Sequence, residues 1–187
     1  MLRADEAAIA RVRASLEAVL AARPHDALAR AHFGWLLVLE ARELPLVPGR
    51  QRATEGITAM DTAVASAPSD LAVRLVRARC CYQLPVALGQ EPVAAADFKW
   101  LLMRLAEAGN ANSPAAIPAG LRREITFHAG AFALKQRDAV GAIQLLEQAA
   151  NTAAPAPSDE DVQSMLALAR RELSSQGHGE DAHPPQS

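Results

Sequence analysis

Five histidines are the side chains with the widest capacity for acid–base or metal chemistry in these 187 residues. His32 and His128 each precede a glycine by two residues, at matching places in two similar stretches. A shared site is one interpretation, and a partly buried packing histidine is the one that we favour. The tail segment HGEDAH, residues 178–183, has the residue types for weak metal binding, but ordering a flexible tail costs free energy. We therefore expect no catalytic histidine and no metal site.

The two cysteines and the scattered carboxylates offer little more. Cys80 and Cys81 are adjacent, which is not the Cys-x-x-Cys spacing of redox or zinc sites, so we expect both to be small core residues. Asp97 and Glu124 are isolated carboxylates that we expect to be solvated. Glycine-rich phosphate loops and Gly-x-Ser-x-Gly elements are absent from the sequence. We predict a protein that is not an enzyme and that carries no cofactor.

The composition narrows the class of partner. The formal net charge is −2 and the pI about 6.2, whereas nucleic-acid binding usually needs a basic face. The charged N-terminus does not resemble a secretory signal, and the longest apolar run, Trp35 to Leu39, is too short to cross a bilayer. We therefore expect a cytoplasmic protein that neither binds nucleic acid nor inserts into a membrane.

The elements that must position any site are helices. Half of the chain is hydrophobic, much of it alanine, and aromatic residues make up only 4%. Apolar residues at spacings of three and four predict about eight helices, at residues 5–22, 27–42, 51–66, 71–83, 93–108, 119–135, 139–151 and 158–174. Ser69 or Asp70 is a suitable N-cap for the fourth of these helices. Two longer loops, ELPLVPGR and LPVALGQEP, separate the second helix from the third and the fourth from the fifth.

One segment, Gly130 to Pro155, resembles a tetratricopeptide repeat. Gly130 is the small residue where the first helix of such a repeat crosses closely to its partner, and KQRD is the tight turn. Two earlier segments have related spacing. The residues that carry the pattern are Ala142, Leu146 and Ala149 in the clearest segment; Gly56, Met60, Ala63 and Pro68 earlier; and Val12, Leu16, Val19 and Pro24 in the first helix.

The resemblance implies an all-α fold: a right-handed superhelix of antiparallel helical hairpins, a tetratricopeptide-like α-solenoid. We expect an N-terminal packing helix at residues 1–26, three hairpins at 27–155, a capping helix at 156–174 and a disordered tail at 175–187. The sequence departs from the family in two ways. Its internal loops are longer than a repeat of about 34 residues allows, and the signature tryptophan is missing from its usual place.

In this family the first helix of each repeat lines a concave groove, which predicts a partner-binding surface. Carried over by motif, the groove is faced by the residues that we expect to bind the partner and by six further residues, namely Ala31, Val38, Leu39, Leu75, Ala131 and Leu134. The residues that we expect to bind the partner are Trp35, Arg79, Tyr82, Gln83, Glu124, Phe127 and Lys135. The apolar set of the first repeat either binds peptide or is covered by the N-terminal helix, and we favour cover.

The two longer loops share a Leu-Pro pair and are a second candidate for binding. Leu44, Leu46, Val86 and Leu88 either contact a partner or fold back onto the helices. We predict a non-catalytic adaptor that binds a protein or peptide through the groove or these loops, as a subunit of a larger, bacterial assembly or as a homodimer. The alternatives are a secretion-type chaperone that holds an extended client, and a helical enzyme or small-molecule sensor.

Overall fold

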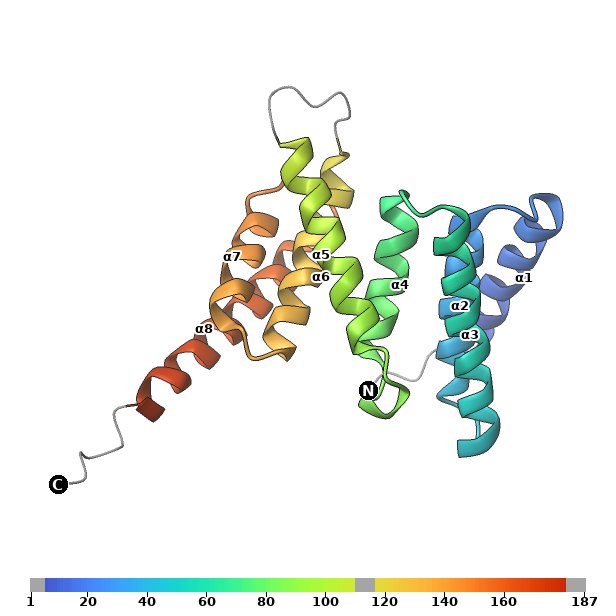
Figure 1. The fold of residues 1–187 in the computed structure, drawn as a ribbon, viewed down its shortest axis with the longest axis horizontal. Helices are drawn as coiled ribbons and strands as arrows, with labels where there is room; N and C mark the ends of the chain where they lie inside the picture. The colour runs from blue at the N-terminus through green and yellow to red at the C-terminus, as the bar shows by residue number, and fades with distance from the viewer. Residues whose placement is uncertain (1–5, 110–116, 181–187) are drawn as a thin grey trace. The chain divides into compact units, whose positions relative to one another are not determined.

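The computed structural model describes the backbone of residues 6–109 and 117–180, and in that part of the chain all regular structure is helical (Figure 1). The elements are α1 (Glu6–Ala22), α2 (Ala27–Ala41), α3 (Leu46–Ser66), α4 (Leu71–Gln83), the 3-10 turn η1 (Val86–Leu88), α5 (Glu91–Ala108), α6 (Ala119–Lys135), α7 (Ala139–Ala150) and α8 (Asp159–Glu180). The prediction of an all-α protein with about eight helices is confirmed. The chain divides within α5 into two compact units, Met1–Leu101 and Leu102–Ser187.

In the first unit, α2 and α3 pack along each other, α4 packs against both, and α1 packs against α2. Aspartate side chains start two of these helices: Asp26 accepts from the amide of Ala29, and Asp70 from those of Ala72 and Val73. The core between α2, α3 and α4 consists of small and medium apolar side chains. Its members include Ala31, Val38, Met60, Ala63, Val64, Val73, Val76 and Cys80.

The second unit is built on the pair α6 and α7, with α8 packed against α7. Asp138 caps α7 by accepting from the amide of Gly141. Gly130 lies where α6 approaches α7, because a Cβ there would stand 2.8 Å from Leu146 Cγ. The close crossing expected at Gly130 is therefore confirmed. The core lies between α7 and α8 and consists of Ala142, Leu146, Ala149, Val162, Leu166 and Ala169.

Two helices begin earlier than predicted, at prolines that we placed in loops. α3 starts at Leu46 rather than residue 51 and carries Pro48 in its first turn, and α5 starts at Glu91 and carries Pro92. A first-turn residue needs no intrahelical N–H partner, so proline fits there. The stretch ELPLVPGR is consequently half loop and half helix.

The last helix continues beyond its predicted end at Ser174. α8 runs to Glu180, so the expected disordered tail from residue 175 is wrong for its first six positions. Ser175 Oγ donates to Glu172 O at 2.7 Å, and Gln176 Nε2 donates to Arg137 O at 3.1 Å. The second bond ties this end of α8 to the α6–α7 turn. The expectation for residues 181–187 lies outside the described residues. Across the described part of the chain, no helix is both long and apolar enough to span a membrane.

Candidate functional site

Four of the predicted groove residues, Trp35, Arg79, Tyr82 and Gln83, lie in the first unit. Three of them take part in aromatic contacts between helices. The guanidinium carbon of Arg79 on α4 lies 4.8 Å from the centroid of the Trp35 ring on α2. The rings of Tyr82 and Phe98 are 5.9 Å apart. Burial raises the pKa of the Tyr82 hydroxyl, against the smaller effects of a Gln83 hydrogen bond and the Arg79 charge.

The other three predicted groove residues lie on α6 in the second unit. Phe127 packs against the core between α7 and α8, and its ring meets that of His128 at 5.0 Å. Glu124 is half-buried and Lys135 is exposed in the last turn of the helix. The structure thus brings Trp35 and Arg79 into contact with each other, while a single groove shared by all seven residues stays a prediction.

The exposure of individual side chains corrects several predictions about which residues face the groove and which are buried. Ala31, Val38 and Leu75 have at most 3% of their surface exposed and belong to the core, so they do not form the open surface of a concave groove. His32 is exposed instead of being partly buried. The N-terminal helix contacts α2 through Arg13, which pairs with Glu40 and lies over the Phe33 ring at 5.5 Å.

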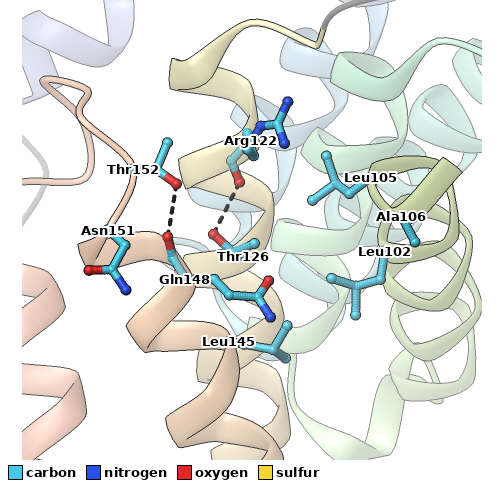
Figure 2. Close-up of a pocket in the computed structure, with 9 residues that line it drawn as sticks. All are labelled: Leu102, Leu105, Ala106, Arg122, Thr126, Leu145, Gln148, Asn151 and Thr152. Atoms are coloured by element: carbon cyan, nitrogen blue, oxygen red, sulfur yellow. Dashed lines mark hydrogen bonds between the residues drawn. The ribbon is translucent and has the colours of Figure 1, made fainter. Parts of the chain in front are cut away.

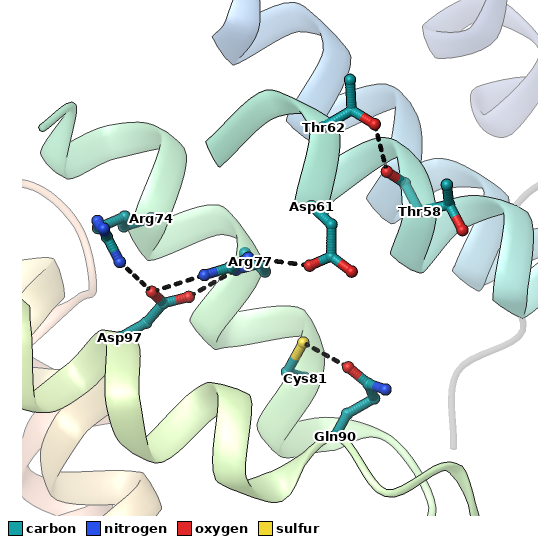
Figure 3. Close-up of polar contacts among 8 residues, drawn as sticks. All are labelled: Thr58, Asp61, Thr62, Arg74, Arg77, Cys81, Gln90 and Asp97. Carbon is teal, nitrogen blue, oxygen red and sulfur yellow. Dashed lines mark hydrogen bonds and ion pairs between the residues drawn. The ribbon is translucent and has the colours of Figure 1, made fainter. Parts of the chain in front are cut away.

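Asp97 is the clearest correction, because it is fully buried where we expected a solvated carboxylate. It lies on α5 and accepts hydrogen bonds from Arg74 Nη1 at 2.7 Å and from Arg77 Nε and Nη2 at 2.7 and 2.9 Å (Figure 3). Arg77 also donates to Asp61 of α3 at 2.9 Å. Burial acts to lower the pKa of Arg77, but its bonds to the two aspartates raise it overall. This cluster joins α3, α4 and α5 and favours the charged form of Arg77.

The cysteines are core residues, as predicted. Cys80 and Cys81 are free, and each has 2% of its surface exposed. Burial raises the pKa of both thiols to about 12, although the charge of Arg42 lowers that of Cys80 in part. Such thiols stay protonated at neutral pH and are poor nucleophiles. Among the described residues, no group of three or more His, Cys, Asp or Glu side chains is arranged to hold a metal ion.

The two Leu-Pro stretches, distant in sequence, meet at one apolar pocket in the first unit. We call it the Leu-Pro pocket, and its volume is about 510 Å³. Side chains from α2, the start of α3, the end of α4 and the 3-10 turn η1 surround it. It is lined by Val38, Ala41, Arg42, Leu44, Leu46, Gly49, Arg50, Ala53, Gln83, Leu84, Pro85, Ala87 and Leu88.

Backbone geometry fixes both walls of the Leu-Pro pocket. At Gly49 a Cβ would lie 2.7 Å from Ala41 O, so only glycine lets the start of α3 pass so close to the end of α2. On the other wall, Leu88 N donates to Pro85 O at 3.0 Å, and Gly89 ends the 3-10 turn at a φ of 63°. Gln90 links this wall to α4, because its amide donates to Leu88 O and its Oε1 accepts from the Cys81 thiol.

Around the pocket, large apolar side chains remain in solvent. The exposed fractions are 86% for Leu46, 77% for Val47 and 75% for Val86, with Leu44 at 40%. Leu88 alone of the four predicted loop residues packs against the core around Met60. Leu88 therefore folds back onto the helices, whereas Leu44, Leu46 and Val86 are exposed, and their contact with a partner stays a prediction.

A second pocket, of about 600 Å³, lies in the second unit (Figure 2). Leucines from the end of α5 and from α7 face it, with Arg122, Thr126, Gln148, Asn151 and Thr152. Its two hydroxyls each donate to a backbone carbonyl four residues earlier: Thr126 Oγ1 to Arg122 O at 3.1 Å, and Thr152 Oγ1 to Gln148 O at 2.8 Å. It offers no nucleophile paired with a base, and Figure 2 shows the Asn151 amide pointing away from the leucines.

Of the two pockets, the Leu-Pro pocket has the more apolar lining. The sequence predicted the two Leu-Pro stretches only as separate loops and did not predict that they form one pocket. The repeated Leu-Pro pair was the one signal in the sequence that connected them. No family model, no curated protein and no solved structure matches this chain, so membership of the tetratricopeptide-repeat family stays a prediction.

Proposed function

We propose that this protein is a non-catalytic binding module whose Leu-Pro pocket holds an apolar segment of a partner protein. The observation that carries the proposal is a set of exposed apolar side chains: Leu44 and Leu46 line this pocket, and Val47 and Val86 are next in the chain to residues that line it. Burying such a side chain is worth about 1.5–3 kcal/mol, and contiguous exposed apolar surface marks interaction sites.

A protein partner accounts for more of this surface than a small molecule does. The pocket has the volume of a ligand site, which is about 300–1,000 Å³. Val47 and Val86, however, lie outside its lining and are still exposed. Apolar surface therefore extends beyond the cavity, as in interfaces where an anchor side chain fills a pocket and neighbouring contacts exclude water.

We further propose that the pairs α2–α3 and α6–α7 are tetratricopeptide-like hairpins. Both pairs cross closely at glycines: Gly34 against Gly56 in the first, and Gly130 against Ala142 and Leu146 in the second. An aspartate caps α2, α4 and α7 in the same way. The partner-binding groove, the cytoplasmic location and the role as an adaptor within a larger assembly are parts of this same proposal.

The test is site-specific photo-crosslinking in the cells that make the protein. A benzophenone side chain replaces Val47, the exposed neighbour of the lining residue Leu46, or, as the matched control, Val12, which is exposed on α1 and lines no part of the pocket. We expect a discrete crosslinked protein from position 47 that disappears in the Leu44→Ser/Leu46→Ser variant. Both leucines are exposed, so circular dichroism should report an intact fold.

The same experiment separates the pocket from the groove. Glu124→Gln with Lys135→Gln alters two predicted groove residues on α6. If this change removes the crosslinked species while the leucine variant retains it, the groove is the binding surface. Equal crosslinking from positions 47 and 12, unaffected by the leucine variant, would show that the Leu-Pro pocket binds no partner.

A further inference from the structure

We infer, on the basis of the proposed function, that the partner segment held by the Leu-Pro pocket is acidic. It combines an apolar anchor, which enters the pocket, with flanking Asp or Glu side chains that pair with Arg42 and Arg50. The inference rests on the distribution of charge around the pocket.

The charged side chains that line the Leu-Pro pocket are two arginines, Arg42 at the end of α2 and Arg50 in α3. Both are exposed, and within the described residues neither guanidinium takes part in a recorded ion pair. Five other arginines of this unit do pair with carboxylates, namely Arg13, Arg23, Arg52, Arg74 and Arg77. The rim of the pocket therefore presents two exposed cationic groups side by side with apolar side chains, whereas Lys99, also exposed and without an ion pair among the described residues, lies outside the pocket lining.

The start of α3 adds to the positive character of the same rim. First-turn amides have no intrahelical acceptor, and the helix dipole places partial positive charge there. Pro45 is the N-cap and supplies no side-chain acceptor, and the first turn contains no acidic residue. The neighbouring helices α2 and α4 instead begin with Asp26 and Asp70. A carboxylate that reaches Arg50 also approaches the uncompensated end of α3.

The nearby acidic residues of α2 and α3 either pair with other arginines or lie outside the pocket lining. Glu43 follows Arg42 in the chain but does not line the pocket, and Glu40 and Glu55 pair with Arg13 and Arg52. The chain as a whole has a formal net charge of −2, so a positive rim around an apolar pocket runs against its average. Complementary charge at a rim favours the matching partner and disfavours a basic one.

The test is a selection of random 12-residue peptides displayed on phage, carried out on the full chain at low salt. Three variants are selected in parallel: Leu44→Ser/Leu46→Ser, which removes apolar rim without changing charge; Arg42→Glu/Arg50→Glu; and Arg23→Glu/Arg52→Glu, which makes the same charge change outside the pocket. Enriched peptides are then synthesised and their Kd measured by fluorescence polarisation.

We expect peptides with Leu, Ile, Phe or Trp flanked by Asp or Glu to be enriched on the wild type. Binding should be lost in the leucine variant, fall about tenfold in Arg42→Glu/Arg50→Glu, and change little in Arg23→Glu/Arg52→Glu. The affinity of the wild type should also fall as salt rises, because the rim pairs are exposed.

The remaining outcomes overturn one proposal or the other. Pocket-dependent peptides with no acidic excess would leave the binding function standing and remove the inference of an acidic partner. Failure to enrich any peptide on the wild type over the leucine variant would overturn the binding function itself. Self-association of the wild type in analytical ultracentrifugation, lost in the leucine variant, would make a second copy the occupant and overturn the inference.

Discussion

Gly34 of α2 and Gly56 of α3 face each other at the crossing of their helices, backbone against backbone. A Cβ built on Gly34 would lie 2.5 Å from Gly56 O, and one built on Gly56 would collide with Gly34 O and lie 2.9 Å from Val38 Cγ2. Real Cβ atoms do not approach so closely, so the two helices can hold this distance only because neither residue has a side chain.

We predict that Gly56→Ala destabilises the protein, although alanine is the better helix former by about 1 kcal/mol. The methyl group would force α2 and α3 apart, and overpacking of this kind costs about 1–3 kcal/mol. The free energy of unfolding in urea measures the effect. Gly120→Ala is the matched control, since a Cβ there would meet nothing within 4 Å. Equal stability of the two variants would show that the crossing is looser than described.

Local signals were enough to predict most of the helices. Leu71–Gln83 and Ala119–Lys135 have the predicted bounds, because apolar residues recur along one face and Asp70 or Pro118 precedes the first turn. The starts of α3 and α5 were missed because proline signals a loop and a first helical turn equally well. The glycine crossings were also predictable, since small residues at fixed spacing let two helices approach.

The sequence of a single helix does not predict which residues of other helices it contacts. Asp97 looked like a solvated carboxylate, yet Ala94, Phe98 and Leu101 place it on the apolar face of α5, which was the available signal. Its partners are on α4, and nothing in the sequence of α5 names them. The Leu-Pro pocket was missed for the same reason: its two walls are separated by more than thirty residues, and only folding brings them together.

We predict that Asp97→Asn is strongly destabilising, by about 3 kcal/mol, because it leaves the buried side of Arg74 and Arg77 without a counter-charge. Urea unfolding monitored by circular dichroism gives the value. Asp61→Asn removes the other partner of Arg77, but 51% of the Asp61 side chain is exposed. That variant should lose no more than about 1 kcal/mol. Similar losses in both variants would contradict a buried, structural role for Asp97.

The two thiols make stability depend on alkaline pH. Their pKa rises from 9.0 to about 12 in the folded chain. Below pH 9 both thiols are protonated in the folded and in the unfolded chain, so their contribution to the free energy of unfolding is fully present. As pH rises from 9 towards 12, the unfolded chain loses protons that the folded chain keeps, so the free energy of unfolding falls. The slope is at most about 1.4 kcal/mol per pH unit for each thiol.

Urea unfolding at pH 7, 9 and 10.5 tests this, with Cys80→Ala/Cys81→Ala as the comparison. We expect a shallower pH dependence in the double variant, whose lower stability at pH 7 reflects lost packing. A second readout is the reaction with a thiol reagent at pH 8, which should be slow in the folded protein and fast in urea. Rapid reaction of the folded protein would show that the thiols are accessible.

Arg123 anchors α8 in the second unit. It has 2% of its surface exposed, yet its Nη1 donates to Thr152 O at 2.8 Å and its Nη2 pairs with Asp159, the first residue of α8. We predict that Arg123→Met costs about 2–3 kcal/mol, since methionine keeps the packing of the stem but leaves the Thr152 carbonyl without its charged donor.

The loss should be local to the start of α8, which distinguishes anchoring from general destabilisation. Hydrogen exchange followed by mass spectrometry should show faster exchange in peptides covering Asp159 and the following turn than in those covering α7. Arg122→Met is the matched control, because Arg122 is half-buried and has no recorded ion pair among the described residues. Equal hydrogen exchange at the start of α8 in both variants would show that the bonds from Arg123 do not hold this helix. Its attachment would then rest on Val162, Leu166 and Ala169, which pack against α7.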